Sequence, residues 1–274
     1  MSSGASKRAA PVALMTDFGY RDHYAGVMKG VIATISPGSA IIDLTHGVPA
    51  QSIAAGAIAL RESWRFFPAD TVFVAIVDPG VGTTRLPIAI ETRAGARLVG
   101  PDNGVLSLAA EEAGVKRVVR IESERYRMPA VSATFHGRDI FAPAAAHLAR
   151  GLSISRLGRR LSAFERLELP RPSAGRKRID GEVIYVDGFG NLVTNIARGD
   201  INRLKASFPA RNVSVRIDKG APISIFDTYG DAPSGAILAT FGSFELLEIA
   251  VRNGNAAERL GCTAGARVAV RIAR

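Results

Sequence analysis

Short apolar runs alternate with helix-spaced segments through the first half of the chain, and polar breaks marked by Gly or Pro separate them. Residues 12–15 and 71–77 have the composition of buried strands, and an aspartate follows each within two residues. Residues 24–35 and 52–67 have the apolar spacing of helices. This alternation predicts an α/β domain with a mostly parallel central sheet.

The pattern changes after about residue 160. Residues 169–176 are rich in Pro, Gly and Arg, as in a linker. Beyond them come short strand candidates with little helix, at residues 179–186, 192–196, 213–217, 223–226, 237–241, 246–251 and 267–272. Short strands divided by turns predict a small antiparallel sandwich or barrel.

We therefore expect two domains. A disordered tail at residues 1–10 precedes an N-terminal α/β domain over residues 11–165. A linker at residues 166–178 leads to a smaller antiparallel C-terminal domain over residues 179–274.

Composition limits the classes of protein to consider. In 274 residues no apolar run reaches the ~18 residues of a membrane span. The first ten residues lack the apolar stretch of a signal peptide, so we expect a cytoplasmic protein without a membrane partner. Cys262 is the single cysteine, which excludes a disulfide within the chain and a thiolate metal cluster.

The net charge of +10 raises the question of nucleic acid. The positive residues are scattered, and the densest run, residues 176–178, falls in the expected linker. Aromatic residues do not interleave with them as in a stacking platform, so we expect no nucleic-acid partner.

Candidate site residues lie in the polar breaks of the first domain. Asp17, Asp78, Arg85 and His136 come from separate loops, and in an open α/β sheet ligands bind at the carboxyl ends of the strands. Other polar residues in such breaks are Asp102, Asn103, Arg138 and Asp139. A structural explanation stays open for each: Asp78 and Arg85 could pair to shape their loop, and a lone histidine is more often structural.

Two kinds of site are disfavoured. The four histidines, His23, His46, His136 and His147, have no HxH or HExxH spacing, so we expect no metal site. A serine hydrolase is disfavoured because the chain has no Gly-x-Ser-x-Gly elbow.

The polar motifs taken together resemble the S-adenosyl-L-methionine (SAM) hydroxide adenosyltransferases, which are related to fluorinating and chlorinating adenosyl enzymes. The matches run in order from residue 12 to residue 255, so the resemblance covers nearly the whole chain. They are Thr-Asp-Phe-Gly at 16–19, Asp-Pro-Gly-Val-Gly at 78–82 with Arg85, Pro-Asp-Asn-Gly at 101–104, Thr-Phe-His-Gly-Arg-Asp at 134–139, Asp-Gly-Phe-Gly-Asn at 187–191 with Thr194-Asn195, and Leu-Glu-Ile-Ala-Val at 247–251.

The resemblance implies a C-terminal β-barrel and a homotrimer, with active sites between the N-terminal domain of one subunit and the C-terminal domain of the next. It implies that SAM and water give adenosine and L-methionine without a cofactor, since SAM is the substrate. By the same resemblance the catalytic residues are Asp78, Arg85 and His136, and the substrate-binding residues are Asp17 for the ribose, Asp22 for the methionine end, Asp187, Asn191, Ser243, Tyr229 stacked on adenine, and the backbone near Asn253.

Departures from the halogenating relatives favour the water-using branch. Those relatives place a serine where this chain has Gly137 and an aromatic where it has His136, and they lack an aspartate at position 78. They also have an arginine where this chain has Phe244. Two alternatives stay open: an adenosyl-halide synthase that uses chloride, and a non-catalytic sensor of SAM or adenosine.

Overall fold

The computed structural model describes residues 8–272, which form a first compact unit up to Leu167 and a second from Glu168. The tail expected at residues 1–10 falls mostly on residues 1–7, which lie outside the described residues. Ala10 is buried, and its N–H donates to the carbonyl of Ala149 at 2.9 Å. No helix among the described residues is long and apolar enough to cross a membrane.

A seven-stranded mixed sheet forms the centre of the first unit. Its strands, in spatial order, are β2 (Ile41–Thr45), β1 (Val12–Thr16), β3 (Val72–Ile76), β5 (Arg97–Pro101), β4 (Pro87–Thr92), β6 (Val115–Arg120) and β7 (Arg160–Leu161). The first four pair in parallel, and β4, β6 and β7 add antiparallel pairs. Most strands of this sheet thus run in one direction, and the predicted mostly parallel α/β domain is confirmed.

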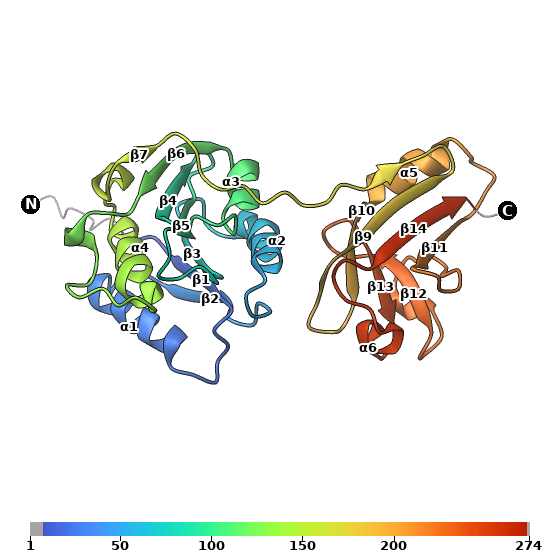
Figure 1. Cartoon of the computed structure of the whole chain (residues 1–274), viewed down its shortest axis with the longest axis horizontal. Helices are drawn as coiled ribbons and strands as arrows, with labels where there is room; N and C mark the ends of the chain where they lie inside the picture. Colours follow the sequence, from blue (N-terminus) through green and yellow to red (C-terminus); the bar gives the residue numbers. More distant parts are fainter. Residues whose placement is uncertain (1–7, 273–274) are drawn as a thin grey trace, which may run out of the picture. The chain divides into compact units, whose positions relative to one another are not determined.

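Helices cover both faces of this sheet (Figure 1). On one face α1 (Tyr24–Ile35) packs against α4 (Ala142–Ala149), and on the other α2 (Ile53–Ser63) packs against α3 (Ser107–Ala113). Short helical turns follow or connect them: η1 (Trp64–Phe66), η2 (Glu124–Tyr126), η3 (Gly137–Phe141) and η4 (Ile154–Arg156). Every residue of β1 and β3 is buried, as expected for parallel strands covered on both faces.

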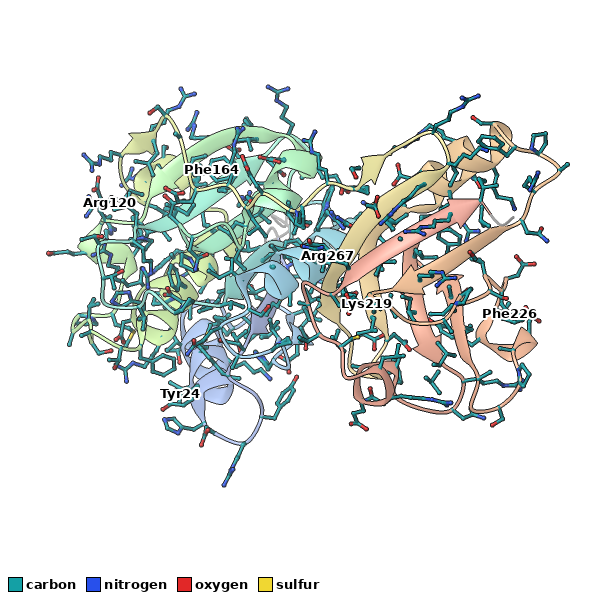
Figure 2. All side chains as sticks on the ribbon, turned by 45° about the vertical axis from the view of Figure 1, so that its right-hand side comes forward. Tyr24, Arg120, Phe164, Lys219, Phe226 and Arg267 are labelled. Atoms are coloured by element: carbon teal, nitrogen blue, oxygen red, sulfur yellow. The ribbon has the colours of Figure 1, made fainter. Side chains whose placement is uncertain are left out.

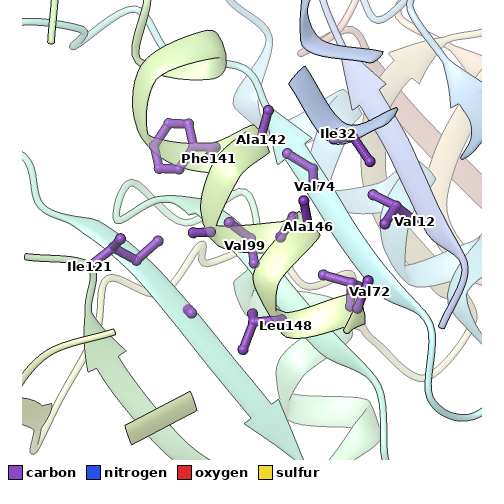
Figure 3. Close-up of a cluster of buried hydrophobic side chains, with 14 of the residues drawn as sticks. Val12, Ile32, Val72, Val74, Val99, Ile121, Phe141, Ala142, Ala146 and Leu148 are labelled. Carbon is purple, nitrogen blue, oxygen red and sulfur yellow. The ribbon is translucent and has the colours of Figure 1, made fainter. Parts of the chain in front are cut away.

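A hydrophobic core fills the space between the sheet and the α1–α4 layer (Figure 3). Val12, Val72 and Val74 of the strands share this cluster with Ile32 of α1 and with Phe141, the last residue of η3. Small alanines along α4 let this helix approach the sheet closely. Because β1, β3 and α4 share one core, the loops that leave them are fixed relative to one another.

The helix that follows His136 begins with an irregular turn. Gly137–Phe141 forms a single π-helical turn, and the α-helix starts only at Ala142 with a proline in its first turn. A proline is tolerated there because the first N–H groups of a helix have no partner within it. Single π-turns are frequent at functional sites, and His136 directly precedes this one.

The second unit is an antiparallel, nearly closed barrel, which confirms the predicted class. Its strands lie in the order β11 (Val213–Ile217), β14 (Arg267–Ile272), β9 (Arg178–Val186), β10 (Leu192–Ala197), β13 (Leu246–Val251) and β12 (Ile237–Phe241), with β8 (Ser173–Ala174) on β9. The strand predicted at residues 223–226 is wrong. This segment makes only single bridges, from Ile223 to Val215 of β11 and from Ile225 to Ala239 of β12, and thereby spans the gap between the end strands.

The second unit also contains helix that the sequence interpretation missed. α5 (Arg198–Ala206) is polar on most sides and buries only Ile201 and Leu204 against the barrel. η5 (Tyr229–Asp231) and α6 (Ala256–Leu260) are too short to show a helical repeat. Sequence periodicity is weak for such elements, because tertiary packing decides them.

Candidate active site

Neighbouring strands bring two acids to one edge of the first sheet. Asp17 directly follows β1 and Asp78 lies two residues beyond β3, and Thr16 pairs with Ile76 at the ends of these parallel strands. A cavity of about 310 Å³ opens at this edge. Its walls come from four loops: Asp17, Phe18, Gln51, Ile76, Asp78, Pro79, Val81, Thr134, Phe135, His136 and Gly137.

Asp78, Arg85 and His136 form one hydrogen-bonded group. Arg85 Nε donates to Asp78 Oδ1 at 2.9 Å, and its Nη2 donates to Asp78 Oδ2. The same Nη2 lies 2.8 Å from His136 Nδ1. The side chains of Arg85 and Asp78 are only 8% and 6% exposed, so this two-pronged pair is rigid and shielded from water.

The contact with Arg85 sets the state of the His136 ring. A guanidinium can only donate hydrogen bonds, so Nδ1 of His136 accepts and the neutral ring carries its proton on Nε2. Burial lowers the pKa of His136, and the positive charge of Arg85 lowers it further. The imidazole therefore stays neutral at neutral pH, with an Nε2–H available to a ligand.

One terminal nitrogen of the Arg85 guanidinium is left without a partner among the described residues. Its Nη1 is buried and has no hydrogen-bond partner among residues 8–272, and the guanidinium lies over the ring of Phe141 at 5.5 Å. A buried N–H without a partner costs about 1–3 kcal/mol. An acceptor within hydrogen-bonding reach of this nitrogen would remove this cost.

The other two candidate acids of the first unit differ in placement. Asp17 lines the cavity, and its Oδ2 accepts a hydrogen bond of 2.8 Å from the backbone N–H of Gln51. Asp22 is exposed in the loop before α1 and does not line the cavity. Tyr24, labelled in Figure 2, starts α1 and packs edge-on against Phe135 beside His136.

Asp102, Asn103 and Asp139 hold loops instead of lining the cavity. Asp102 Oδ1 accepts from the N–H of Glu165 at 2.8 Å, and Asn103 Nδ2 donates to the carbonyl of Val77 at 2.8 Å. Asp139 is 1% exposed, pairs with Arg138 and accepts from the N–H of Ser132 at 2.9 Å. These contacts fix the backbone around Asp78 and His136, so the local composition that marks a site also marks its scaffold.

In the second unit, Asp187 and Asn191 fold the turn between β9 and β10. Asp187 Oδ1 accepts from the N–H groups of Phe189 and Asn191 at 2.8 and 2.9 Å, and its Oδ2 accepts from Asn191 Nδ2 at 2.9 Å. Asn191 is 8% exposed, whereas Phe189 is 81% exposed at the tip. These hydrogen bonds make the turn rigid, and the ring of Phe189 lies exposed at its tip.

Tyr229 has a partner that sequence interpretation missed. Its hydroxyl donates to Glu248 Oε2 at 2.6 Å, and burial together with this carboxylate strongly raises the pKa of Tyr229. Burial and the charge of Asp187 raise the pKa of Glu248 as well. The sequence does hold a signal for this contact, because Glu248 is a single acid within the apolar run of β13.

Ser243 and Asn253 complete the second-unit candidates. Ser243 is exposed in the turn between β12 and β13. Asn253 has φ +59° in the turn after β13, and its Nδ2 donates to Ser234 Oγ at 3.2 Å. The structure thus assembles Asp17, Asp78, Arg85 and His136 in the first unit and a separate polar set in the second.

Comparison with known proteins identifies the family. Residues 12–158 match the SAM hydroxide adenosyltransferase N-terminal domain, and residues 181–269 match the C-terminal domain. The chain belongs to the SAM hydroxide adenosyltransferase family.

Three curated relatives match along nearly their whole length. An (R)-S-adenosyl-L-methionine hydrolase from Thermus thermophilus is 40% identical over 93% of this chain and 97% of its own, and one from Salinispora tropica is 37% identical over 94% and 97%. A fluorinase from Nocardia brasiliensis is 27% identical over 95% and 96%. The chain is thus more similar to these hydrolases than to this fluorinase.

Solved structures share the fold. An uncharacterized conserved protein from Thermotoga maritima superimposes with a TM-score of 0.87 at 38% identity, covering 95% of this chain and 99% of its own. A conserved hypothetical protein from Thermus thermophilus gives 0.77 at 37% identity, covering 96% and 100%.

Proposed function

We propose that this chain is a SAM hydrolase in which water attacks C5′ of SAM to give adenosine and L-methionine. The observation that carries the proposal is the buried Asp78–Arg85–His136 group at the wall of a cavity that Asp17 also lines. The names of the hydrolase relatives support the same activity.

The chemistry needs a positioned water more than a strong acid or base. The C5′–S bond breaks as the C5′–O bond forms, the sulfonium leaves as the neutral thioether of methionine, and the water releases one proton. Because the leaving group is already activated, holding the water in line with C5′ and excluding bulk water supply most of the rate.

Each residue of the group has a role in this scheme. Arg85 supplies a fixed positive charge that stabilises the hydroxide-like oxygen, and its unpaired Nη1 offers a donor. His136 donates from Nε2 and orients the water oxygen. Asp78 lines the cavity, and its carboxylate has more acceptor sites than Arg85 uses, so it can take the proton that the water loses late in the reaction. Replacing Arg85 by Ala tests these roles: full hydrolysis with normal SAM binding would remove the assignment.

For the remaining residues we propose substrate contacts. Asp17 accepts from the ribose hydroxyls, and Asp22 serves the methionine end. A neighbouring copy in a homotrimer brings the second-unit contacts: Asp187, Asn191, Tyr229, Ser243 and the backbone near Asn253. The rigid Asp187–Asn191 turn and the polarised Tyr229 hydroxyl support this assignment. Mass photometry of the full chain tests the trimer.

The test of the reaction is incubation with SAM in chloride-free ¹⁸O-water, followed by mass spectrometry. Adenosine that carries ¹⁸O at its 5′ position, together with free methionine, is the expected result. SAM that stays bound and intact, with no adenosyl halide when chloride is added, would make the chain a sensor. An adenosyl chloride that forms with chloride would make it a halide-using transferase.

A further inference from the structure

A series of hydrogen-bonded polar side chains ends at Thr16, next to Asp17 in the cavity wall. The hydroxyl of Thr16, the residue before Asp17, lies 2.8 Å from His46 Nδ1, and His46 Nε2 lies 3.2 Å from Asp43 Oδ1. Thr16 and His46 are both 0% exposed. Asp43 in turn accepts from Lys29 Nζ at 2.6 Å and from the Tyr20 hydroxyl at 3.2 Å.

The direction of each hydrogen bond in this series is fixed. Burial alone would raise the pKa of Asp43, but the hydrogen bonds from Lys29 and His46 outweigh it and lower that pKa, so Asp43 is a carboxylate that only accepts. His46 Nε2 therefore carries the proton. Burial lowers the pKa of His46, so the ring is neutral and its Nδ1 accepts from the Thr16 hydroxyl.

These bonds lead to the backbone that carries Asp17. With its proton directed at His46, Thr16 Oγ1 accepts from the N–H of Phe18 at 3.1 Å. The carbonyl of His46 accepts from the N–H of Gly19 at 2.8 Å, at a glycine with φ +68°. The turn that contains Asp17 is thus held by the Thr16 side chain and by the His46 backbone.

The same segment that supplies His46 also contacts the carboxylate itself. Five residues after His46, the N–H of Gln51 donates to Asp17 Oδ2 at 2.8 Å. The N–H groups of Phe18 and Gly19 are thus both anchored, and the ring of Phe18 packs edge-on against Phe135, the neighbour of His136. The hydrogen bonds that join Asp43, His46 and Thr16 thereby connect β2 and the loop after it to the wall of the cavity.

We infer that Thr16 and His46 are positioning residues that hold the Asp17 carboxylate in the orientation needed to accept both hydroxyls of a ribose. This inference rests on the proposed function, because it takes the ligand to be an adenosine nucleoside. A carboxylate binds a diol best when each of its oxygens faces one hydroxyl, so small rotations of the turn weaken recognition.

The test is a double-mutant cycle on the full chain, with adenosine as the probe in titration calorimetry. Thr16→Val keeps the shape of the side chain but leaves the N–H of Phe18 and Nδ1 of His46 without a partner. The adenosine Kd is expected to rise roughly tenfold. Thr16→Ser keeps the hydroxyl and should restore binding to within about twofold. In an Asp17→Asn background, Thr16→Val should add little, because the group that it positions is already lost.

Controls separate positioning from general support of the fold. His46→Asn is paired with His147→Asn as a control. The second variant removes an imidazole of α4 that takes no part in the hydrogen bonds from Asp43 to Thr16. Only the first should weaken adenosine binding and reduce the preference for adenosine over 3′-deoxyadenosine. Melting temperatures report whether each variant is folded.

Two outcomes would overturn the inference in distinguishable ways. If Thr16→Val weakens binding as much in the Asp17→Asn background as in the unmodified chain, the hydroxyl supports the fold and not the carboxylate, while the proposed hydrolysis stands. If the unmodified chain binds neither SAM nor adenosine, the proposed function fails, and the role of Asp17 fails with it.

Discussion

Arg85 Nη2 lies 2.8 Å from His136 Nδ1, and this contact decides which nitrogen of the neutral imidazole carries the proton. Arg85 Nη2 also donates to Asp78 Oδ2. One guanidinium therefore orients an acid and a histidine that are 58 residues apart in sequence. A point charge on a flexible stem cannot make this set of contacts.

Arg85→Lys should therefore behave as a damaging substitution despite keeping the charge. Lysine cannot make the two-pronged pair with Asp78 and reach His136 at once. We expect kcat for SAM hydrolysis to fall about 10²- to 10³-fold, with a smaller change in KM. Chromatographic detection of adenosine measures both constants. A kcat within tenfold of the unmodified enzyme would show that fixed charge alone is sufficient.

Gly137→Ser tests whether the serine expected in halogenating relatives fits here. A Cβ at this position would lie 3.0 Å from Met28 Sδ and 3.2 Å from the Phe135 ring. We expect the free energy of unfolding to fall by about 1–3 kcal/mol and chloride use not to appear. Urea denaturation and product analysis with chloride measure the two effects.

Gly26→Ser is the matched control for that substitution. Gly26 lies in α1, and a Cβ there meets nothing within 4 Å. Serine has a higher helix propensity than glycine, so this variant should gain about 0.5 kcal/mol in the free energy of unfolding. If both serines destabilise equally, crowding at Gly137 is not the cause.

The sequence predicted the buried strands and the polar candidates at their ends because both depend on local pattern. Buried parallel strands are apolar throughout, and the polar residue after each strand is visible without a structure, as with Asp17 and Asp78. Sequence pattern cannot separate residues that line the cavity from those that hold its loops. Asp78 and Asp139 look alike in sequence, but only Asp78 lines the cavity, while Asp139 secures the loop around Ser132.

The missed features depend on contacts between distant segments. Glu248 partners Tyr229 across 19 residues, and Thr16 partners His46 across 30. α5 was missed because it buries only two residues, too few for a clear apolar stripe. The strand predicted at 223–226 has strand composition, yet it forms only single bridges at the gap in the barrel.

Acid should destabilise the protein first through its histidines. Burial holds the pKa values of His46, His136 and His147 below 6.5 in the folded protein. Between the folded and unfolded pKa values the unfolded chain binds more protons, so the free energy of unfolding rises with pH there. This stability is fully present above about pH 6.5 and is lost as the pH falls through the lowered values.

A second loss of stability should follow at lower pH, because hydrogen bonds lower the pKa values of Asp43 and Asp139 below 3.8 in the folded protein.

Urea denaturation between about pH 8 and pH 5 measures the loss of stability that the histidines cause. His147→Gln should flatten the slope by the contribution of one group. Stability that increases on acidification across this range would contradict the assignment.

Gln51 offers a test of how the Asp17 carboxylate is held. Its backbone has φ +64°, a conformation that disfavours side chains, and its N–H donates to Asp17 Oδ2. Gln51→Gly keeps the N–H and relieves the strain, so the free energy of unfolding should rise by about 0.5 kcal/mol, and adenosine affinity should change only by the loss of the side chain from the cavity wall. Gln51→Pro removes the N–H and fixes φ at about −65°, so adenosine affinity should fall roughly tenfold or more. Calorimetry on the two variants decides the matter: equal affinities would mean that the backbone donor is dispensable and that Asp17 is oriented from the Thr16 side alone.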